Sequence, residues 1–192
     1  MTKKPHHHGD LRRALISAGL EILRESGLAG LTLRGAAARA GVSHAAPAHH
    51  FDGLPGLMQA LAAHGWAAFS NIMRQDRAVA PTTPRGQLLG ICNGYLRFAH
   101  EEPALFALIF NTDFAMLRSA EVEVESGIAY AILQDACAPF APISPTEGST
   151  ELMVWSLVHG LACLQSAGHV ADPDLAQLQG YFAEILPQLP LR

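Results

Sequence analysis

Apolar residues recur every three or four positions along most of this 192-residue chain, and no segment alternates apolar with polar residues as a half-buried strand does. This is the period of an amphipathic helix, so the pattern predicts an all-α fold. Glycines, prolines and capping residues divide the pattern into about nine segments. We expect helices at residues 11–26, 32–40, 43–50, 55–79, 86–100, 103–111, 116–138, 149–168 and 173–185. The first three would form a small N-terminal domain, and the others a larger helical bundle.

The composition is that of a globular protein. Hydrophobic residues make up 49% of the chain and charged residues 16%, which is too apolar for a disordered chain. No apolar run approaches the roughly 20 residues of a membrane span, and the N-terminus lacks the apolar core of a signal peptide, so we expect a cytoplasmic protein with no membrane partner. Cys92, Cys137 and Cys163 are far apart and form no CxxC pair, which argues against a disulfide or a cysteine zinc site.

Charge is distributed unevenly along the chain. Residues 1–79 carry nine Lys or Arg and five Asp or Glu, a net charge of +4. Residues 80–192 carry four and twelve, a net charge of −8. Seven of the ten histidines also lie in the basic part, where protonation would raise the charge further. The asymmetry indicates that only the N-terminal part meets a polyanion.

Residues 32–51, TLRGAAARAGVSHAAPAHHF, combine the features of a helix-turn-helix. Ala37 is small enough for two helices to cross closely, and Gly41 can adopt the left-handed conformation of a tight turn, with Val42 filling the core behind it. The second helix of such a motif projects its exposed side chains into the major groove of DNA. The pattern alone leaves open an ordinary helical hairpin within a bundle.

Two segments resemble one protein family. Residues 7–51, HHGDLRRALISAGLEILRESGLAGLTLRGAAARAGVSHAAPAHHF, resemble the N-terminal domain of the tetracycline-repressor (TetR) family of transcription regulators. MVWSLVHG at 153–160 resembles the Trp-x-x-x-His-Gly signature of the C-terminal domain in one branch of that family. The resemblance implies a homodimeric repressor that a small effector releases from its operator. It places a DNA-binding domain at residues 1–52, a connecting helix at 53–80, and an effector-binding and dimerisation domain at 81–192.

The resemblance also implies which residues meet DNA. The positions that match the family's contacts are Thr32, Arg34, Ser43, His44, Ala45, Ala46, His49 and His50. The family's usual tyrosine is replaced by Ala48 and a common lysine by Leu54, and each change removes a contact to the DNA backbone. We expect the tail residues Lys3 and Lys4, and charged histidines, to compensate. The histidines do not have the i and i+4 spacing of a helical metal site, so we expect no metal and no cofactor.

The segment 149–168 is apolar nearly all round, because Ser156 and His159 are the only polar side chains between Leu152 and Leu164. Such a helix is buried on two sides, one of which can face a ligand. His159 is either a core side chain bonded to a carbonyl or an effector contact. We expect a small apolar or aromatic effector to be bound by Phe98, Phe106, Phe110, Trp155, His159 and Cys163. Ser156 and His159 have no acid partner in the pattern, so we do not expect an enzyme.

Apolar residues of the last two helices resemble the family's two-helix dimer surface. The residues assigned to it are Leu161, Leu164, Leu175, Leu178 and Phe182. Packing of this stripe within a single subunit is the alternative. Because of Ala48 and Leu54, a second function also stays open. The chain could be an all-helical small-molecule binding protein or enzyme that kept the fold but binds DNA weakly.

Overall fold

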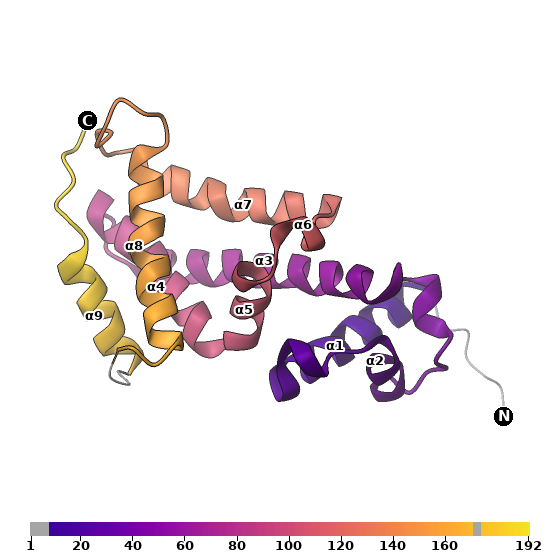
Figure 1. Ribbon diagram of the computed structural model, residues 1–192. Coiled ribbons are helices and arrows are strands. Elements are labelled where there is room, and N and C mark those ends of the chain that lie inside the picture. The colour runs from indigo at the N-terminus through magenta and orange to yellow at the C-terminus, as the bar shows by residue number, and fades with distance from the viewer. Residues whose placement is uncertain (1–7, 171–173) are drawn as a thin grey trace. The chain divides into compact units, whose positions relative to one another are not determined.

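The computed structural model describes residues 8–170 and 174–192, which Figure 1 follows from α1 to α9. These residues form nine α-helices and one short 3-10 helix, with no strand among them beyond an isolated bridge between Phe140 and Leu191. The all-α fold predicted from the helical period is confirmed. None of the described helices is both long and apolar enough to cross a membrane.

The chain divides into two compact units. The first holds the residues up to Gly65 together with Ala104–Glu123, and the second holds Trp66–Pro103 together with Val124–Arg192. Two helices, α3 (Gly53–Val79) and α7 (Ala120–Cys137), continue from one unit into the other.

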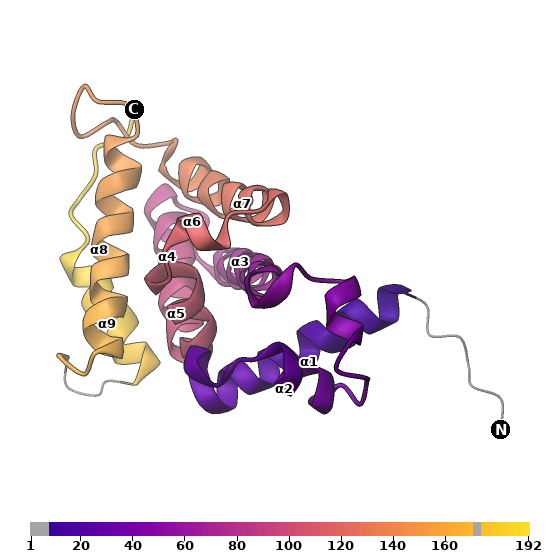
Figure 2. The same cartoon turned by 45° about the vertical axis from the view of Figure 1, so that its right-hand side comes forward.

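In the first unit, α1 (His8–Gly30) packs against α2 (Leu33–Arg39), as Figure 2 shows. A side chain at Gly19 of α1 would approach Leu61 of α3 to 3.2 Å, so this glycine allows close contact between the two helices. Gly27, with a φ of 63°, breaks α1 where the sequence predicted the helix to stop, and one further turn reaches Gly30. The unit also contains α5 (Pro103–Asn111) and α6 (Phe114–Leu117).

The turn after α2 has the geometry expected of a helix-turn-helix. Thr32 caps the start of α2, because its Oγ1 accepts the N–H of Gly35 at 3.0 Å. At the other end Gly41 has a φ of 70°, and the N–H of Val42 donates to the carbonyl of Ala37 at 3.0 Å. These are the marks of a glycine-terminated helix, in which a left-handed residue satisfies the last carbonyls.

Residues 43–50, called the reading segment below, differ from the expectation. In place of a helix from Ser43 to His50, the structure has a single 3-10 turn, η1 (Ala46–His49), with no side-chain cap. Pro47 is the physical reason, because it has no N–H to donate and its ring disfavours α geometry at Ala46. The N–H of Ala46 instead donates to the carbonyl of Ser43 at 3.0 Å, which is an i to i−3 bond.

In the second unit, α4 (Pro84–Glu101) is the central helix, and both α8 (Ser149–Ser166) and α9 (Leu175–Ile185) pack against it. Gly94 lets α4 approach α3, since a side chain there would come within 2.6 Å of the Cα of Met73. The guanidinium of Arg85 donates to the carbonyls of Ala183 and Leu186, both at 3.0 Å. These bonds satisfy carbonyls at the C-terminal end of α9 and hold that helix on α4.

The helix expected over residues 116–138 is two helices, α6 and α7. Ser119 lies between them, and its Oγ accepts the N–H of Val122 at 3.2 Å. A serine in this position satisfies a free N–H at a helix start, so α7 begins anew instead of continuing α6. One serine inside an apolar period is a weak signal, which explains why the sequence pattern reads as continuous.

Candidate functional site

The reading segment presents its polar side chains to solvent. Ser43, His44 and His49 are exposed, as is Ala45, while Pro47 is buried beneath them. Ala46 and His50 are half-buried. The stretch that the sequence analysis predicted to be exposed is largely exposed, although a longer helix was predicted there. Thr32 is also exposed, but its hydroxyl oxygen already serves as the cap of α2.

Two arginines of α2 have different electrostatic surroundings. Arg39 bonds to Glu25 of α1 at 2.6 Å and lies 3.7 Å from Glu21. The hydrogen bond raises the pKa of Arg39 and lowers the pKa of Glu25, which keeps both groups charged. Arg34 is exposed and has no ion-pair partner among the described residues. Its charge is therefore the one on α2 that is available to a phosphate.

Arg12 of α1 contacts the chain directly after the reading segment. Its guanidinium lies 5.8 Å from the ring centre of Phe51 and forms two hydrogen bonds with Glu121, at 3.1 and 2.9 Å. Phe51 directly follows the reading segment and is buried. No spacing rule connects residues 12, 51 and 121, so the sequence could not have identified this contact. Lys3 and Lys4, which were expected to support DNA binding, lie outside the described residues.

A second group of polar side chains joins α4 and α8 in the second unit. The Oη of Tyr95 lies 2.7 Å from Nδ1 of His159, and Sγ of Cys163 lies 3.4 Å from Nε2 of the same ring. Trp155 lies near enough to Tyr95 to act on the pKa of its phenol. His159 thus has a side-chain partner at each of its two ring nitrogens, in addition to sharing a helix face with Trp155 and Cys163 as the spacing predicted.

Burial sets the protonation of this group. It raises the pKa of Tyr95, so the phenol stays protonated, although the nearby Trp155 opposes this shift. Burial also lowers the pKa of His159, so the ring is neutral at neutral pH. A protonated phenol and a neutral imidazole can each donate or accept, so the Tyr95–His159 pair keeps one hydrogen bond without any charged group. Burial likewise raises the pKa of Cys163, which keeps that thiol neutral.

The phenylalanines assigned to the effector site have separate surroundings. Phe98 is fully buried, and its ring centre lies 5.2 Å from that of Phe69, which in turn packs edge-on against Tyr95 at 4.9 Å. Phe98 therefore supports Tyr95 from the core of the second unit. Phe106 and Phe110 pair with each other at 5.0 Å in the first unit. Tyr95 is the member that the sequence did not identify, because one tyrosine in the apolar α4 gives no periodic signal.

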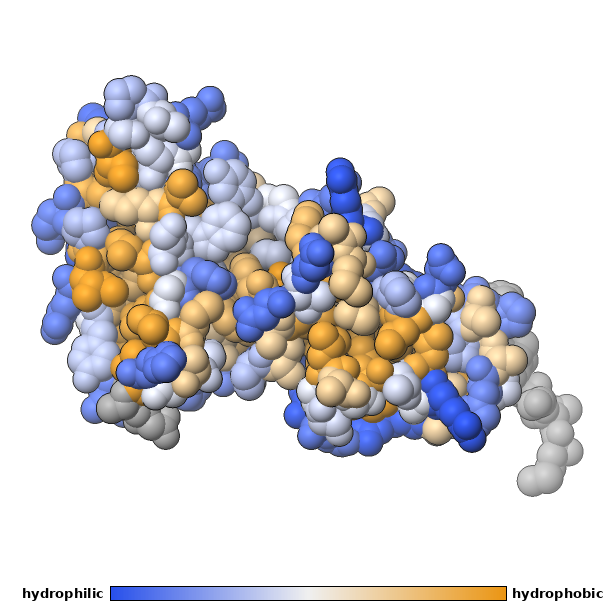
Figure 3. Space-filling model, in the orientation of Figure 1, coloured by the Kyte–Doolittle hydropathy of each residue, from blue (hydrophilic) through white to orange (hydrophobic). Residues whose placement is uncertain are grey.

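The residues assigned to a dimer surface are also divided. Phe182 and Leu178 of α9 are 0% and 1% exposed, so they belong to the core of this chain and offer a second subunit no surface. They occupy the centre of the apolar stripe, and α9 packs that centre against α4. Leu161 and Leu175 are half-buried, and Leu164 is exposed. Large apolar side chains that the structure exposes on α8 and α9 are Leu152, Trp155, Leu164, Tyr181 and Ile185. Figure 3 shows apolar side chains along the visible face of α8.

A protein-family comparison identifies the second half of the chain. Residues 88–187 match the model of the tetracyclin repressor-like C-terminal domain. The match covers just over half of the chain and includes most of α4 and all of α8 and α9. A search of the curated proteins gave no match.

Solved structures share the fold over nearly the full length. A protein of unknown function from Rhodococcus sp. RHA1 is 27% identical, with a TM-score of 0.75, over 97% of this chain and 100% of its own. A TetR family transcription regulator from Marinobacter aquaeolei VT8 is 15% identical, with a TM-score of 0.66, over 95% and 96%. The multidrug binding protein EbrR, in complex with imidazole, is 19% identical, with a TM-score of 0.63, over 92% and 95%. The last two likenesses show the common fold.

Proposed function

Because this chain belongs to the TetR family of DNA-binding transcription regulators, we propose that it is a homodimeric repressor that a small molecule releases from its operator. The observation that carries the proposal is the turn at Gly41, which leads from a capped α2 into an exposed segment bearing serine and histidines. The proposed domains are residues 1–52 for DNA binding, 53–80 for connection, and 81–192 for effector binding and dimerisation.

For DNA recognition we propose that Arg34 contacts a phosphate and that Ser43, His44 and His49 face the major groove. Alanines at 45 and 46 would lie against base edges without donating hydrogen bonds. Thr32 would act as the cap of α2, which orients that helix so that its N-terminal N–H groups face the phosphate backbone of the DNA. In a dimer the two reading segments would meet successive major grooves, roughly 34 to 36 Å apart.

The proposed dimer surface is the exposed apolar part of α8 and α9. Large apolar side chains on these two helices are about half exposed or more, namely Leu152, Leu164, Tyr181 and Ile185. Exposure of several such side chains to water is unfavourable and is typical of a surface that a partner covers. Leu161 and Leu175, both half-buried, would complete it. Two subunits that pair these helices would form a four-helix arrangement with two-fold symmetry.

For the effector we propose contact with Trp155, His159 and Cys163 on α8 and with Tyr95 on α4. The Trp-x-x-x-His-Gly segment, residues 155–160, supplies two of these groups, and it supports placing the chain in the branch with that signature. A small aromatic or apolar molecule with one hydrogen-bonding group would compete with the Tyr95–His159 bond and move α8 against α4. The repressor would then release DNA, if that movement favours a subunit arrangement with misaligned reading segments.

A second function keeps the same ligand site without strong DNA binding. Three observations favour it, namely Ala48, Leu54 and the single turn that stands in place of a recognition helix. A small-molecule binding protein of this kind would keep the TetR fold and bind DNA only through general charge attraction.

Fluorescence anisotropy with the DNA upstream of the protein's own gene separates the two functions. A repressor should bind this DNA at least about 1,000-fold more tightly than a scrambled duplex at physiological salt. Arg34→Ala and His49→Ala should weaken specific binding by about tenfold each, whereas Arg74→Ala, which changes an exposed arginine of α3, should not. Equal affinity for both duplexes would support the second function.

A further inference from the structure

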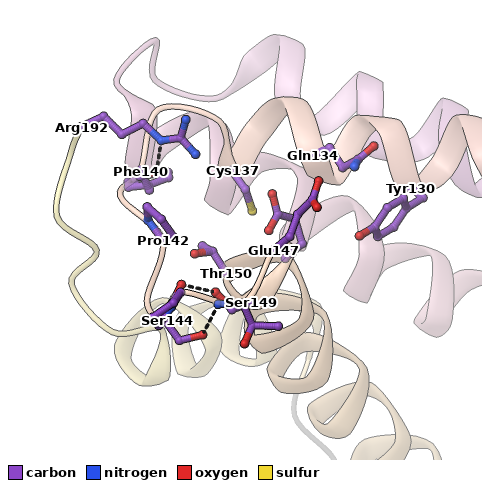
Figure 4. Close-up of a pocket in the computed structure, with 14 residues that line it drawn as sticks. Tyr130, Gln134, Cys137, Phe140, Pro142, Ser144, Glu147, Ser149, Thr150 and Arg192 are labelled. Carbon is purple, nitrogen blue, oxygen red and sulfur yellow. Dashed lines mark hydrogen bonds between the residues drawn. The ribbon is translucent and has the colours of Figure 1, made fainter.

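The second unit contains a pocket of about 540 Å³ between the end of α7 and the start of α8. Its size is within the range of small-molecule sites. Figure 4 shows that α7 contributes Tyr130, Gln134 and Cys137, which share one face of the helix at spacings of four and three. The loop 139–148, the first turn of α8 and Arg192 supply the other walls. Neither Tyr95 nor His159 lines this pocket, so it is distinct from the effector site proposed above.

The walls of the pocket are held by hydrogen bonds within the unit. The N–H of Ala141 donates to the carbonyl of Pro190 at 2.8 Å, and Nε of Arg192 donates to the carbonyl of Phe140, also at 2.8 Å. The loop is bonded to α8 as well, because the N–H of Ile143 donates to Oγ1 of Thr150 at 3.2 Å. A ligand would therefore enter a preformed site instead of ordering a loose one.

Several polar side chains around the pocket have no protein partner. The carboxylates of Glu147 and Glu151 form no ion pair or hydrogen bond within the described part of the chain. The hydroxyl of Tyr130 and the side-chain amide of Gln134 are likewise unpartnered there. Thr150 is only 4% exposed, and its oxygen accepts the Ile143 N–H, which leaves its own O–H free to donate into the pocket.

The charge of the lining is negative. Glu147 and Glu151 are opposed by one guanidinium, that of Arg192, which already donates to a backbone carbonyl. Glu151 lies in the first turn of α8, and Glu147 directly precedes its cap residue Gly148. Cys137 stays a neutral thiol, because burial raises its pKa to about 12. The site therefore favours a cation.

A metal ion does not suit this lining. Among the described residues, no three His, Cys, Asp or Glu side chains gather closely enough to hold one. The pocket is also several times larger than a metal site, and five of its side chains are hydroxyl-bearing, namely Tyr130, Ser144, Thr146, Ser149 and Thr150. Hydroxyls and carboxylates together match the N–H groups of a protonated amine.

We propose that this pocket binds a small polar organic amine in its protonated form, with Glu147 and Glu151 as its charged partners. Tyr130 forms the aromatic wall, and its ring centre lies 6.3 Å from that of Trp155. A cation against Tyr130 would gain a cation–π contact. Because Trp155 belongs to the proposed effector site and packs near Tyr130, the amine would alter the surroundings of a side chain in that site, and the two ligands would influence each other's affinity.

Calorimetric titration with spermidine tests the proposal on the full chain. We expect saturable binding, weakened about tenfold by Glu147→Gln or by Glu151→Gln and about 100-fold by both, because each loses a charge-assisted hydrogen bond. Both residues are at least partly exposed, so the variants should fold. Glu184→Gln removes the same charge from the exposed side of α9 and should leave affinity unchanged. In a Trp66→Phe variant, spermidine should also change the emission of Trp155, the remaining tryptophan.

Three results would overturn the proposal. One is the absence of saturable spermidine binding. A second is an equal loss in Glu184→Gln, since spermidine would then follow the general negative charge of the surface. The third is tighter binding of succinate than of spermidine, because Arg192 would then set the charge of the ligand.

Discussion

Among single side chains, His159 and Arg34 show how surroundings decide what a residue can do. His159 is half-buried and bonded to Tyr95 and Cys163, and burial lowers its pKa, so its ring is neutral at neutral pH. Arg34 is exposed and unpaired within the described chain, so its charge is available to a partner. The first residue therefore bears on stability and on the proposed ligand binding, and the second on the proposed DNA contact.

The free energy of unfolding should decrease as pH falls, and part of this decrease should come from His159. Burial lowers the pKa of His159 in the folded state, so the unfolded chain binds the proton more readily. Stability is therefore fully present above the unfolded value of about 6.5 and decreases as pH falls below it, by at most about 1.4 kcal/mol per pH unit for one proton. Urea unfolding at pH 7.5 and 5.5 measures the loss. His159→Gln should lose less than the wild type, while the exposed His100→Gln should lose as much. The same pH dependence in all three proteins would contradict the neutral His159.

The DNA affinity of Arg34→Ala should depend less on salt than that of the wild type. Each phosphate contact contributes about 0.9 to the slope of log affinity against log salt, so a dimer that loses two contacts should lose about 1.8. Arg39→Ala is the matched control, because Arg39 is already paired with Glu25 and Glu21. Operator titrations between 50 and 200 mM salt give the slopes. If the two variants had equal slopes, the phosphate contact would have to come from elsewhere.

At the scale of elements, the sequence predicted helices well where apolar period and capping residues agree. The end of α2 at Gly41 and the break at Gly27 follow from glycine alone. The reading segment could not be predicted in the same way, because Ser43 indicates a helix start and Pro47 acts against it, and only the packed structure decides between them. Contacts between elements that are far apart in the chain, such as Arg12 with Glu121 or Tyr95 with His159, produce no recognisable pattern of residue spacing in the sequence. The central residues of α9 were predicted as apolar, but no pattern tells an intrachain face from a subunit face.

Substitution of Gly41 should destabilise the turn between α2 and the reading segment. Alanine at a φ of 70° costs about 1–2 kcal/mol, because its Cβ crowds the backbone in the left-handed region. Gly127→Ala in α7 is the counterpart, since nothing lies within 4 Å of its added methyl group and its backbone is helical. That variant should gain about 0.5–1 kcal/mol. Urea unfolding compares the two, and a stable Gly41→Ala that binds DNA normally would show that the turn does not need a left-handed residue.

At the scale of the whole molecule, assembly depends on the side chains that each chain leaves exposed. Leu164 is 49% exposed on α8 and Ile185 is 50% exposed on α9, while Phe182 beside them is fully buried. A change at Phe182 would therefore disturb folding before it could report on assembly. The informative positions are the exposed ones.

Leu164→Glu should convert the protein to monomers that bind a palindromic operator weakly. The added charge would be buried without a partner in the proposed interface but would remain solvated in the monomer. Val124→Glu places the same charge on an exposed apolar site of α7, 60% exposed, and should stay dimeric. Sedimentation velocity distinguishes the species. A dimeric Leu164→Glu variant would exclude this surface, and a monomeric wild type would exclude the dimer itself.

Pro47 gives the reading segment a property that does not depend on its contacts with other residues. Its ring restricts the backbone, it is buried, and a 3-10 turn closes around it. A segment restricted in this way should lose little conformational freedom in the proposed contact with DNA. A longer helix that frays in the free protein would need to be ordered at that moment. Without the family's tyrosine and lysine contacts, this chain would therefore still lose little conformational entropy on binding DNA. Its affinity should then be set mainly by the contacts that the reading segment makes.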